Sequence, residues 1–182
     1  MKMRFFALFT LCVFTPLVAT AQPSQTQSPQ EIARHIIDLT KSGEQMNLKA
    51  VGSALGEPDL YNTAVFTSVG ENNSYGNTYR PQNPKTPLKT IRHEIWLDMD
   101  SGFSKVNSAV EFEFKDGQCP SIADFERLSG NNAMAFNIPT SPDLITGKGG
   151  HYTTHYIDVS DTQKLSITQN GCRVSVYSQA KL

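Results

Sequence analysis

The chain has 182 residues, of which 16 are Lys or Arg and 17 are Asp or Glu, so its formal net charge is −1. Hydrophobic residues make up 38% of the chain, which fits one globular domain of ordinary size. Because the chain carries no excess of positive charge, it lacks the electrostatic footprint of a nucleic-acid-binding protein, and we exclude nucleic acid as the expected partner.

Residues 1–21 have the pattern of a secretory signal peptide. Lys2 and Arg4 precede an apolar run from Phe5 to Ala19, and Ala19-Thr20-Ala21 supplies the small residues of a cleavage site. The run is shorter than the about 20 apolar residues of a membrane-spanning helix. We therefore expect an exported mature chain that does not span the membrane and is periplasmic or, alternatively, secreted. It keeps 14 basic and 17 acidic residues, a net charge of −3.

Two cysteines remain after the leader is removed. An even number of cysteines in an exported chain favours a disulfide, so we expect a bond between Cys119 and Cys172. It would close a loop of more than fifty residues and stabilise the fold by roughly 4 kcal/mol in the chain-entropy model. The alternative, a redox-active or metal-binding pair, would favour a Cys-x-x-Cys spacing that these residues do not have.

The first part of the mature chain predicts a lead-in and two helices. Residues 22–29 are polar and contain proline, so we expect a flexible lead-in before a single domain over 30–182. Apolar residues recur at helical spacing over Gln30–Gly43, and a second short helix is predicted over Asn47–Gly56. Asn47 is placed to cap the second helix, and each glycine is placed to end one.

Beyond the second helix the hydrophobic pattern changes to alternation, which indicates strands. Residues 61–69 predict one strand, and 91–115 predict a hairpin with its turn at Ser101-Gly102. Both faces of this hairpin make chemical sense in a single register. That register pairs Leu97 with Val106, Ile95 with Ser108, His93 with Val110, Ile91 with Phe112, Arg92 with Glu111, and Asp98 with Lys105.

A second hairpin is centred on Asn170-Gly171, a strong two-residue turn signal. Its register opposes Leu165 to Val176 and Ile167 to Val174. A strand over about 151–159 is predicted to precede it, joined by a loop around Asp161 that lets Ile157 face Ile167.

A short helix from Ser121 to Gly130 is predicted between the two hairpins, with Asp124 at the capping-box spacing. No internal repeat is visible in the sequence. The resulting fold class is α+β: two N-terminal helices packed on an antiparallel sheet of about five to seven strands, with one disulfide.

The end of the second helix carries the pattern Val51-x-x-x-Leu55-Gly56-x-Pro58, followed by antiparallel strands. This pattern resembles the helix-to-sheet junction of small envelope domains, namely the β-lactamase-inhibitor-like proteins and the small lipoprotein of the outer-membrane assembly machinery. The resemblance implies a helix-helix-sheet module that binds proteins. The chain departs from the lipoprotein branch because it lacks the lipidated cysteine.

Residues 70–90 form an unusually long predicted connection, and connections of this length are often functional. Tyr and Arg favour binding hot spots, and the stretch is basic. We therefore assign it to partner binding, together with a tryptophan on the adjoining hairpin. The candidate contact residues are Tyr75, Tyr79, Arg80, Lys85, Lys89 and Trp96. The alternative is that this Asn-, Pro- and Gly-rich stretch is merely mobile.

Catalytic and metal-binding patterns are weak. His151 and His155 lie in a predicted strand, where four residues span about 13 Å and cannot ligate one zinc ion together. His93 is expected to be a hydrogen-bonded interior residue. We assign no catalytic residue, metal or cofactor, and expect a non-enzymatic inhibitor or immunity protein that binds an exported enzyme or toxin. The alternatives are a small exported hydrolase that uses these histidines with carboxylates, and an envelope-assembly component.

If the 70–90 stretch contacts the partner, reversing the charge of Arg80 and Lys85 should weaken partner binding without lowering the melting temperature. The two measurements are an affinity titration and a thermal melt. Unchanged affinity would count against this stretch as the contact surface.

Overall fold

The structure is a computed structural model that describes residues 27–45, 47–57, 60, 64–69, 74–97, 104–139, 150–168 and 171–181. The predicted signal peptide lies outside these residues, as do the predicted turn Ser101-Gly102, the hairpin partner Asp98, and Asn170.

Three helices occur in the described residues: α1 (Pro29–Ser42), α2 (Leu48–Ala54) and α3 (Ile122–Ser129). α1 begins with a capping box, in which the Ser28 hydroxyl accepts the Glu31 N–H at 3.2 Å and the Glu31 carboxylate accepts the Ser28 N–H at 2.7 Å. It ends at Gly43, whose φ of 76° lies in the left-handed region that glycine adopts without strain. All three predicted helices are confirmed.

Eight strands within the described ranges form one antiparallel sheet. In chain order they are β1 (Ala64–Val69), β2 (Tyr75–Tyr79), β3 (Leu88–Leu97), β4 (Lys105–Phe114), β5 (Met134–Pro139), β6 (His151–Ser160), β7 (Gln163–Thr168) and β8 (Arg173–Lys181). The α+β class with helices on an antiparallel sheet is confirmed, and the sheet has one strand more than the upper end of the expected range.

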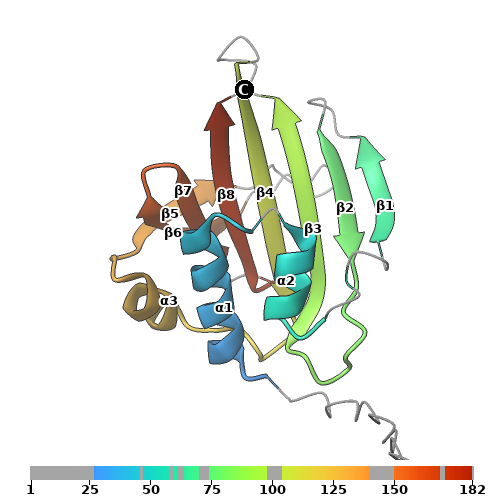
Figure 1. The fold of residues 1–182 in the computed structure, drawn as a ribbon. Coiled ribbons are helices and arrows are strands. Elements are labelled where there is room, and N and C mark those ends of the chain that lie inside the picture. Colours follow the sequence, from blue (N-terminus) through green and yellow to red (C-terminus); the bar gives the residue numbers. More distant parts are fainter. Residues whose placement is uncertain are drawn as a thin grey trace, which may run out of the picture.

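The strand order β1-β2-β3-β4-β8-β7-β6-β5 divides the sheet into two meanders of four consecutive strands. The last strands of the two meanders, β4 and β8, pair at the centre of the sheet, and β1 and β5 form its two edges (Figure 1). One or two helices precede each meander in the chain. The two halves therefore share a topology although their sequences show no repeat.

The register predicted for the first hairpin is confirmed for all five pairs within the described residues, from Ile91 opposite Phe112 to Leu97 opposite Val106. The second hairpin also has the predicted register. The prediction that Ile157 faces Ile167 is wrong, because Ile157 pairs with Leu165. The connection between β6 and β7 is a tight turn over 161–162 with a register shift before it, and this geometry moves the pairing by two residues.

The prediction that 70–90 is one long loop is also wrong. β2 lies inside it, and β3 begins at Leu88. β2 has the sequence YGNTY, which lacks the apolar alternation of a recognisable strand, and it is held by pairing on both sides with β1 and β3. β5 was missed although Met134, Phe136 and Ile138 alternate along its run MAFNIP, because the run is short and ends in proline.

The core lies between the helices and one face of the sheet. Ile32, Ile36 and Ile37 of α1 are at most 1% exposed, and they belong to one cluster with Phe112 of β4 and Val174 of β8. Burying a side chain of this size contributes about 1.5–3 kcal/mol. The helical spacing of the isoleucines therefore fixes which face of α1 meets the sheet.

The disulfide between Cys119 and Cys172 is confirmed, with the two Cα atoms 5.6 Å apart. It joins the connection after β4 to the residue that precedes β8. Beside it, the Phe114 N–H donates to the Cys172 carbonyl at 3.0 Å. The covalent bond thus secures the end of the β4–β8 pair.

The connection between β2 and β3 is anchored on two sides. The Glu57 carboxylate is 5% exposed and accepts the consecutive backbone N–H groups of 82–83, each at 3.0 Å. The Lys115 ammonium donates to the carbonyls of Pro84 and Thr86 at 2.8 and 2.7 Å. Both anchors reach this connection from distant parts of the chain, so it is structured by tertiary contacts.

None of the helices in the described ranges is long and apolar enough to cross a membrane.

Replacing Glu57 with Ala removes the acceptor of two partly buried backbone hydrogen bonds. We expect Glu57→Ala to lower the free energy of unfolding by roughly 1–3 kcal/mol, measured by urea denaturation. Glu44→Ala is the matched control, because Glu44 is an exposed glutamate after α1 and its loss should cost less than about 0.5 kcal/mol. Equal stability of the two variants would show that the Glu57 anchor contributes nothing.

Candidate functional site

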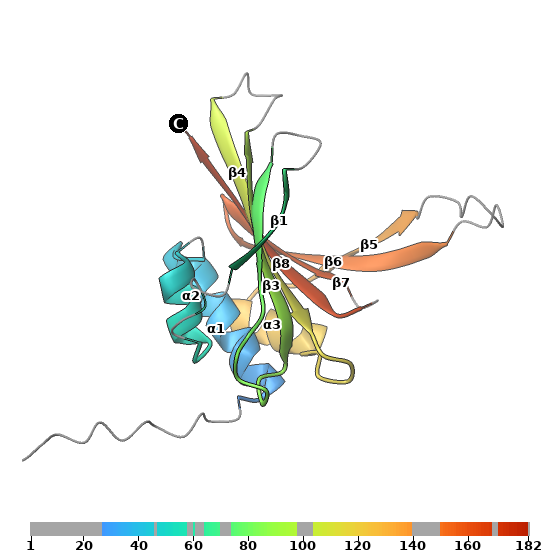
Figure 2. The same cartoon turned by 90° about the vertical axis from the view of Figure 1, so that its right-hand side faces the viewer.

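The two faces of the sheet differ in what covers them. The helices lie on one side, while the two half-sheets diverge and enclose a wide angle that holds none of the described helices (Figure 2). We call the uncovered surface the open face. Residues opposite each other on paired strands share a face. The registers therefore trace one row of side chains across it: Arg92, Glu111, Ser175, Ser166, Tyr156 and Met134.

A hollow of about 580 Å³ lies in the open face, across β4, β8, β7 and β6 and reaching β5. Its size falls within the range of ligand pockets, about 300–1,000 Å³. Hydroxyl-bearing side chains make up most of its lining. The lining residues are Glu111, Ile138, Gly150, His151, Tyr152, Thr154, Tyr156, Ser166, Thr168, Arg173, Ser175 and Tyr177.

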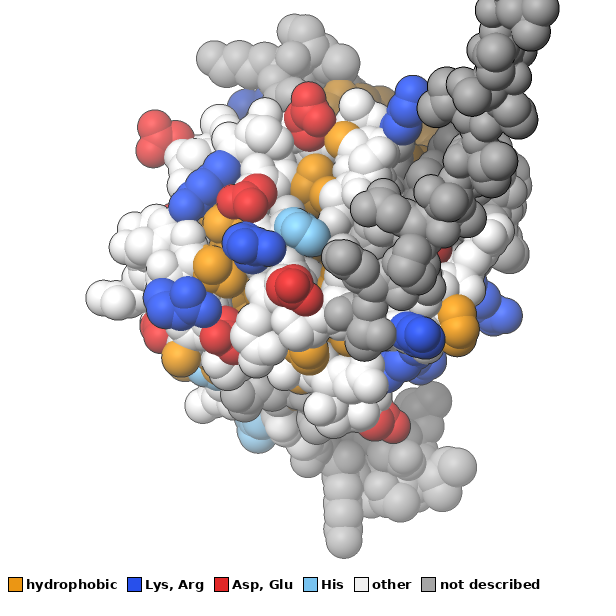
Figure 3. All heavy atoms as spheres, turned by 60° about the horizontal axis from the view of Figure 1, so that its bottom comes forward, with side chains coloured by type: hydrophobic (Ala, Val, Ile, Leu, Met, Phe, Trp, Pro, Cys, Tyr) orange, Lys and Arg blue, Asp and Glu red, His pale blue; other side chains and the backbone are white. Residues whose placement is uncertain are grey.

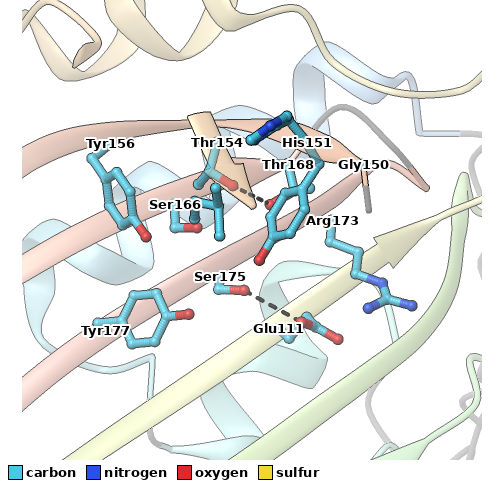
Figure 4. A pocket seen from close by; sticks show the side chains of 12 residues that line it. Glu111, Gly150, His151, Thr154, Tyr156, Ser166, Thr168, Arg173, Ser175 and Tyr177 are labelled. Atoms are coloured by element: carbon cyan, nitrogen blue, oxygen red, sulfur yellow. Dashed lines mark hydrogen bonds between the residues drawn. The ribbon is translucent and has the colours of Figure 1, made fainter. Parts of the chain in front are cut away.

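The tyrosines give this hollow both apolar and polar contact groups. The hydroxyl ends of Tyr156 and Tyr177 point toward its middle (Figure 4). Burial raises the pKa of Tyr177, and hydrogen bonds with Ser175 and Ser166 act in the opposite direction. The Tyr177 hydroxyl therefore stays protonated at neutral pH and can donate a hydrogen bond. Thr154 and Thr168 share a further hydrogen bond of 3.1 Å across β6 and β7.

Acidic and basic side chains on the open face are arranged near one another. The Arg92 guanidinium lies 3.1 Å from the Glu94 carboxylate. The Lys89 ammonium lies 2.8 Å from the Glu113 carboxylate, and this contact, assisted by the charge of Arg173, lowers the pKa of Glu113. Each of these contacts pairs a positive with a negative side chain. Shape and hydrogen bonding, more than net charge, therefore determine which ligands this face can bind.

Glu111 stands at the inner end of the hollow. Its carboxylate accepts a long hydrogen bond of 3.5 Å from the Ser175 hydroxyl (Figure 4). It also lies directly opposite Arg92 on the neighbouring strand. The hollow therefore offers an incoming ligand a carboxylate acceptor among tyrosine rings.

Two smaller depressions continue the hollow. One of about 100 Å³ shares Glu111, Ser175 and Tyr177 with it and also contains Trp96. The other, of about 240 Å³, is lined by Trp96 and Tyr177 together with Asn107 and Gln179. The shared aromatic residues join the three depressions into one trough across the open face.

The predicted partner-binding residues do not gather in one place. Trp96 lies on the open face and lines the trough. Tyr75 is 69% exposed but lies on the other face of the sheet. It pairs with Ile95, whose side chain is on the same face as the core residue Ile91. Tyr79 is 1% exposed and belongs to the core, which is incompatible with its predicted role as a contact residue.

The predicted basic residues lie apart from the trough. Arg80 and Lys85 are exposed in the anchored connection between β2 and β3, and Lys89 is engaged with Glu113. The helix side of the molecule carries acidic and basic side chains interspersed with hydrophobic ones (Figure 3). None of these three basic residues lines the hollow or the two smaller depressions, so the trough is a different surface from the predicted 70–90 stretch.

The histidines are separated in space. His151 and His155 lie on strand β6, as predicted, so their Cα atoms are about 13 Å apart. His93 on β3 and His155 on β6 are four strand positions apart, or roughly 19 Å. The described residues contain no group of three or more His, Cys, Asp or Glu side chains arranged to hold a metal ion. His93 is 9% exposed, and its Nε2 has no hydrogen-bond partner among the described atoms.

Sequence reasoning missed most of the trough, namely Tyr152, Tyr156, Tyr177 and Glu111. A usable signal existed, because the predicted registers placed Trp96 and Glu111 on the face opposite to the core residues. Extending that row to β8 required knowing that β4 pairs with β8, which is a contact distant in sequence.

Comparison with protein-family models, with curated proteins and with solved structures finds no match for this chain. The fold and the open face therefore carry the functional argument.

Burial lowers the pKa of His93 below its ordinary value of 6.5, so the unfolded chain binds a proton more readily than the folded chain. The stability contributed by neutral His93 is complete above about pH 6.5 and is lost as the pH falls below it. Urea denaturation between about pH 7.5 and 5 should show a smaller loss of stability for His93→Gln than for the wild-type chain.

The comparison variant is His35→Gln. Burial also lowers the pKa of His35, but His35 is less buried, so this replacement should change the pH dependence of stability less than His93→Gln does. If His93→Gln leaves the slope of stability against pH unchanged, the proton-linked instability arises elsewhere.

Proposed function

We propose that this chain is an exported, non-enzymatic protein-binding module that inhibits or neutralises an enzyme or toxin of the periplasm. The open face of the sheet is its contact surface. The observation that carries the proposal is the trough itself, a concave surface that no described helix covers, built on paired strands and lined by Trp96, Tyr156 and Tyr177.

The composition of the trough supports recognition of a protein. Tyr and Trp supply large contact area at a low cost in conformational entropy, and Ser and Thr supply adaptable hydrogen bonds, as in antibody paratopes. Tyr177 is 37% exposed, so part of its ring is already covered while an exposed part remains for a partner. This combination favours a preformed surface over a segment that must fold on binding.

Export is supported by the sequence of residues 1–21 and is compatible with the disulfide. The periplasmic location and the inhibitory role are the parts of the proposal that need experiment. A hydrolase based on His93, His151 and His155 gains no support from their geometry, because these residues do not converge on one pocket among the described residues.

The test starts from the mature chain with its disulfide formed. A partner captured from periplasmic extract is identified and purified, and its affinity is measured by calorimetry. We expect the double substitution Trp96→Ala with Tyr177→Ala to weaken binding roughly tenfold or more, because aromatic residues that fill pockets at an interface often dominate its binding energy. Tyr75→Ala is the matched control, since it removes an exposed ring from the other face.

A second readout separates inhibition from mere binding. Trp96 is the single tryptophan of the chain, so fluorotryptophan labelling places one reporter on the open face. Adding the partner should shift this resonance and should lower the partner's own activity in proportion to complex formation. If Tyr75→Ala weakens binding and the double variant does not, the contact surface is wrong; if binding leaves the partner's activity unchanged, the inhibitory role is wrong.

A further inference from the structure

The strand β5 forms one edge of the sheet. It pairs with β6 over all six of its residues without a register shift, and no described strand lies on its other side. In an antiparallel ladder, every second residue of an edge strand directs its N–H and C=O groups away from its neighbour. The outer side of β5 is therefore a regular template for one more strand.

This edge lacks the usual protection against pairing. Edge strands of soluble proteins commonly carry charged residues, prolines or bulges that block an additional strand. The sequence of β5 contains no charged residue, and its only proline is its last residue, Pro139. Met134 is 52% exposed and Phe136 is 49% exposed, so apolar side chains accompany the open backbone.

The β5 edge is continuous with the trough. The rings of Phe136 and Tyr156 form an edge-to-face contact with centroids 5.4 Å apart, and Tyr156 lines the hollow. Ile138 of β5 is itself part of the hollow lining. β5 also lies toward the end of an arm of the sheet that projects away from the helices (Figure 2). The hollow and the outer edge of β5 therefore form one continuous surface, which a single partner can contact.

We infer that the partner adds an extended, uncharged segment to the outer edge of β5 as a ninth strand. This inference rests on the proposed function and specifies how the partner binds. Main-chain hydrogen bonds supply affinity in this mode, and alternate side chains supply specificity. The residues of the added strand that face the trough side lie beside Phe136 and Met134, so they are apolar. A partner reaching both β5 and the hollow buries more area than a second copy paired only along this short strand.

The test uses two disulfide-closed β-hairpin peptides as probes for the added strand. In the first, the free strand alternates Val and Thr. The second is identical but carries N-methyl groups on the outward amides of that strand, which removes the hydrogen-bond donors and keeps the side chains. Amide hydrogen exchange of the mature chain is measured while each peptide is titrated.

We expect the first peptide to slow exchange at alternate residues of 134–138 and the methylated peptide to bind about tenfold more weakly or worse. Phe136→Lys should abolish this protection while the chain stays folded, because half of this side chain is exposed; the loss of its ring contact with Tyr156 should lower the melting temperature only slightly. Ser53→Lys, which adds the same charge at an exposed position of α2, should leave the protection intact.

The inference is overturned by absence of protection at β5, by equal binding of the two peptides, or by protection of β1 in place of β5. Its failure is distinguishable from failure of the proposed function. If the peptide does not bind but substitution of Trp96 and Tyr177 still weakens partner binding, strand addition is rejected and the trough proposal stands. If the peptide protects β5 but substitution of Trp96 and Tyr177 leaves partner binding unchanged, the trough proposal is rejected and strand addition stands.

Discussion

The antiparallel pairing of β4 with β8 is the interaction on which the rest of the structure depends. It is the only strand pairing between the two meanders of the described sheet. One side of this pair contributes Phe112 and Val174 to the core, and the other side carries Glu111 and Ser175 on the open face. The same backbone hydrogen bonds therefore hold together both the hydrophobic core and the trough. The Cys119 disulfide secures the end of this pair and limits how far the two halves can separate.

The open face gains its shape from the twist of the sheet. Strands in a sheet rotate successively with one hand, so a sheet of eight strands cannot remain flat. The helices cover the face that carries the apolar row, and the two half-sheets diverge on the opposite side (Figure 2). Because the aromatic groups of the trough are attached to paired strands, binding orders few additional residues. A partner would meet this surface already formed, which reduces the entropic cost of association.

The structure changes where on the molecule binding is expected. From the sequence, the contact residues other than Trp96 are expected between 70 and 90, because the stretch is long, basic and contains two tyrosines. Tertiary contacts turn that stretch into a strand and an anchored connection, in which Glu57 and Lys115 bind the backbone and Tyr79 enters the core. Trp96 remains on an accessible face, because its position follows from alternation along a hairpin whose register was predictable. Loop composition and strand register therefore point to different surfaces, and the proposed contact surface follows from strand register.

Local pattern alone determined the three helices and the two hairpin registers, because capping residues, turn residues and alternation act between neighbours in the chain or across one turn. The disulfide was expected from the two cysteines of the predicted mature chain. The positions of β2 and β5 were not determined in this way, although both pair with strands that are consecutive in the chain, because YGNTY lacks apolar alternation and MAFNIP is short and ends in proline. Local pattern did not determine the trough either. Glu111, Tyr156 and Tyr177 come together only when β4 pairs with β8 and β7 pairs with β6. The β6–β7 pairing was expected from the sequence, two residues out of register. Tertiary structure decided the β4–β8 pairing, because it joins strands distant in sequence and depends on packing two apolar faces against the same helices.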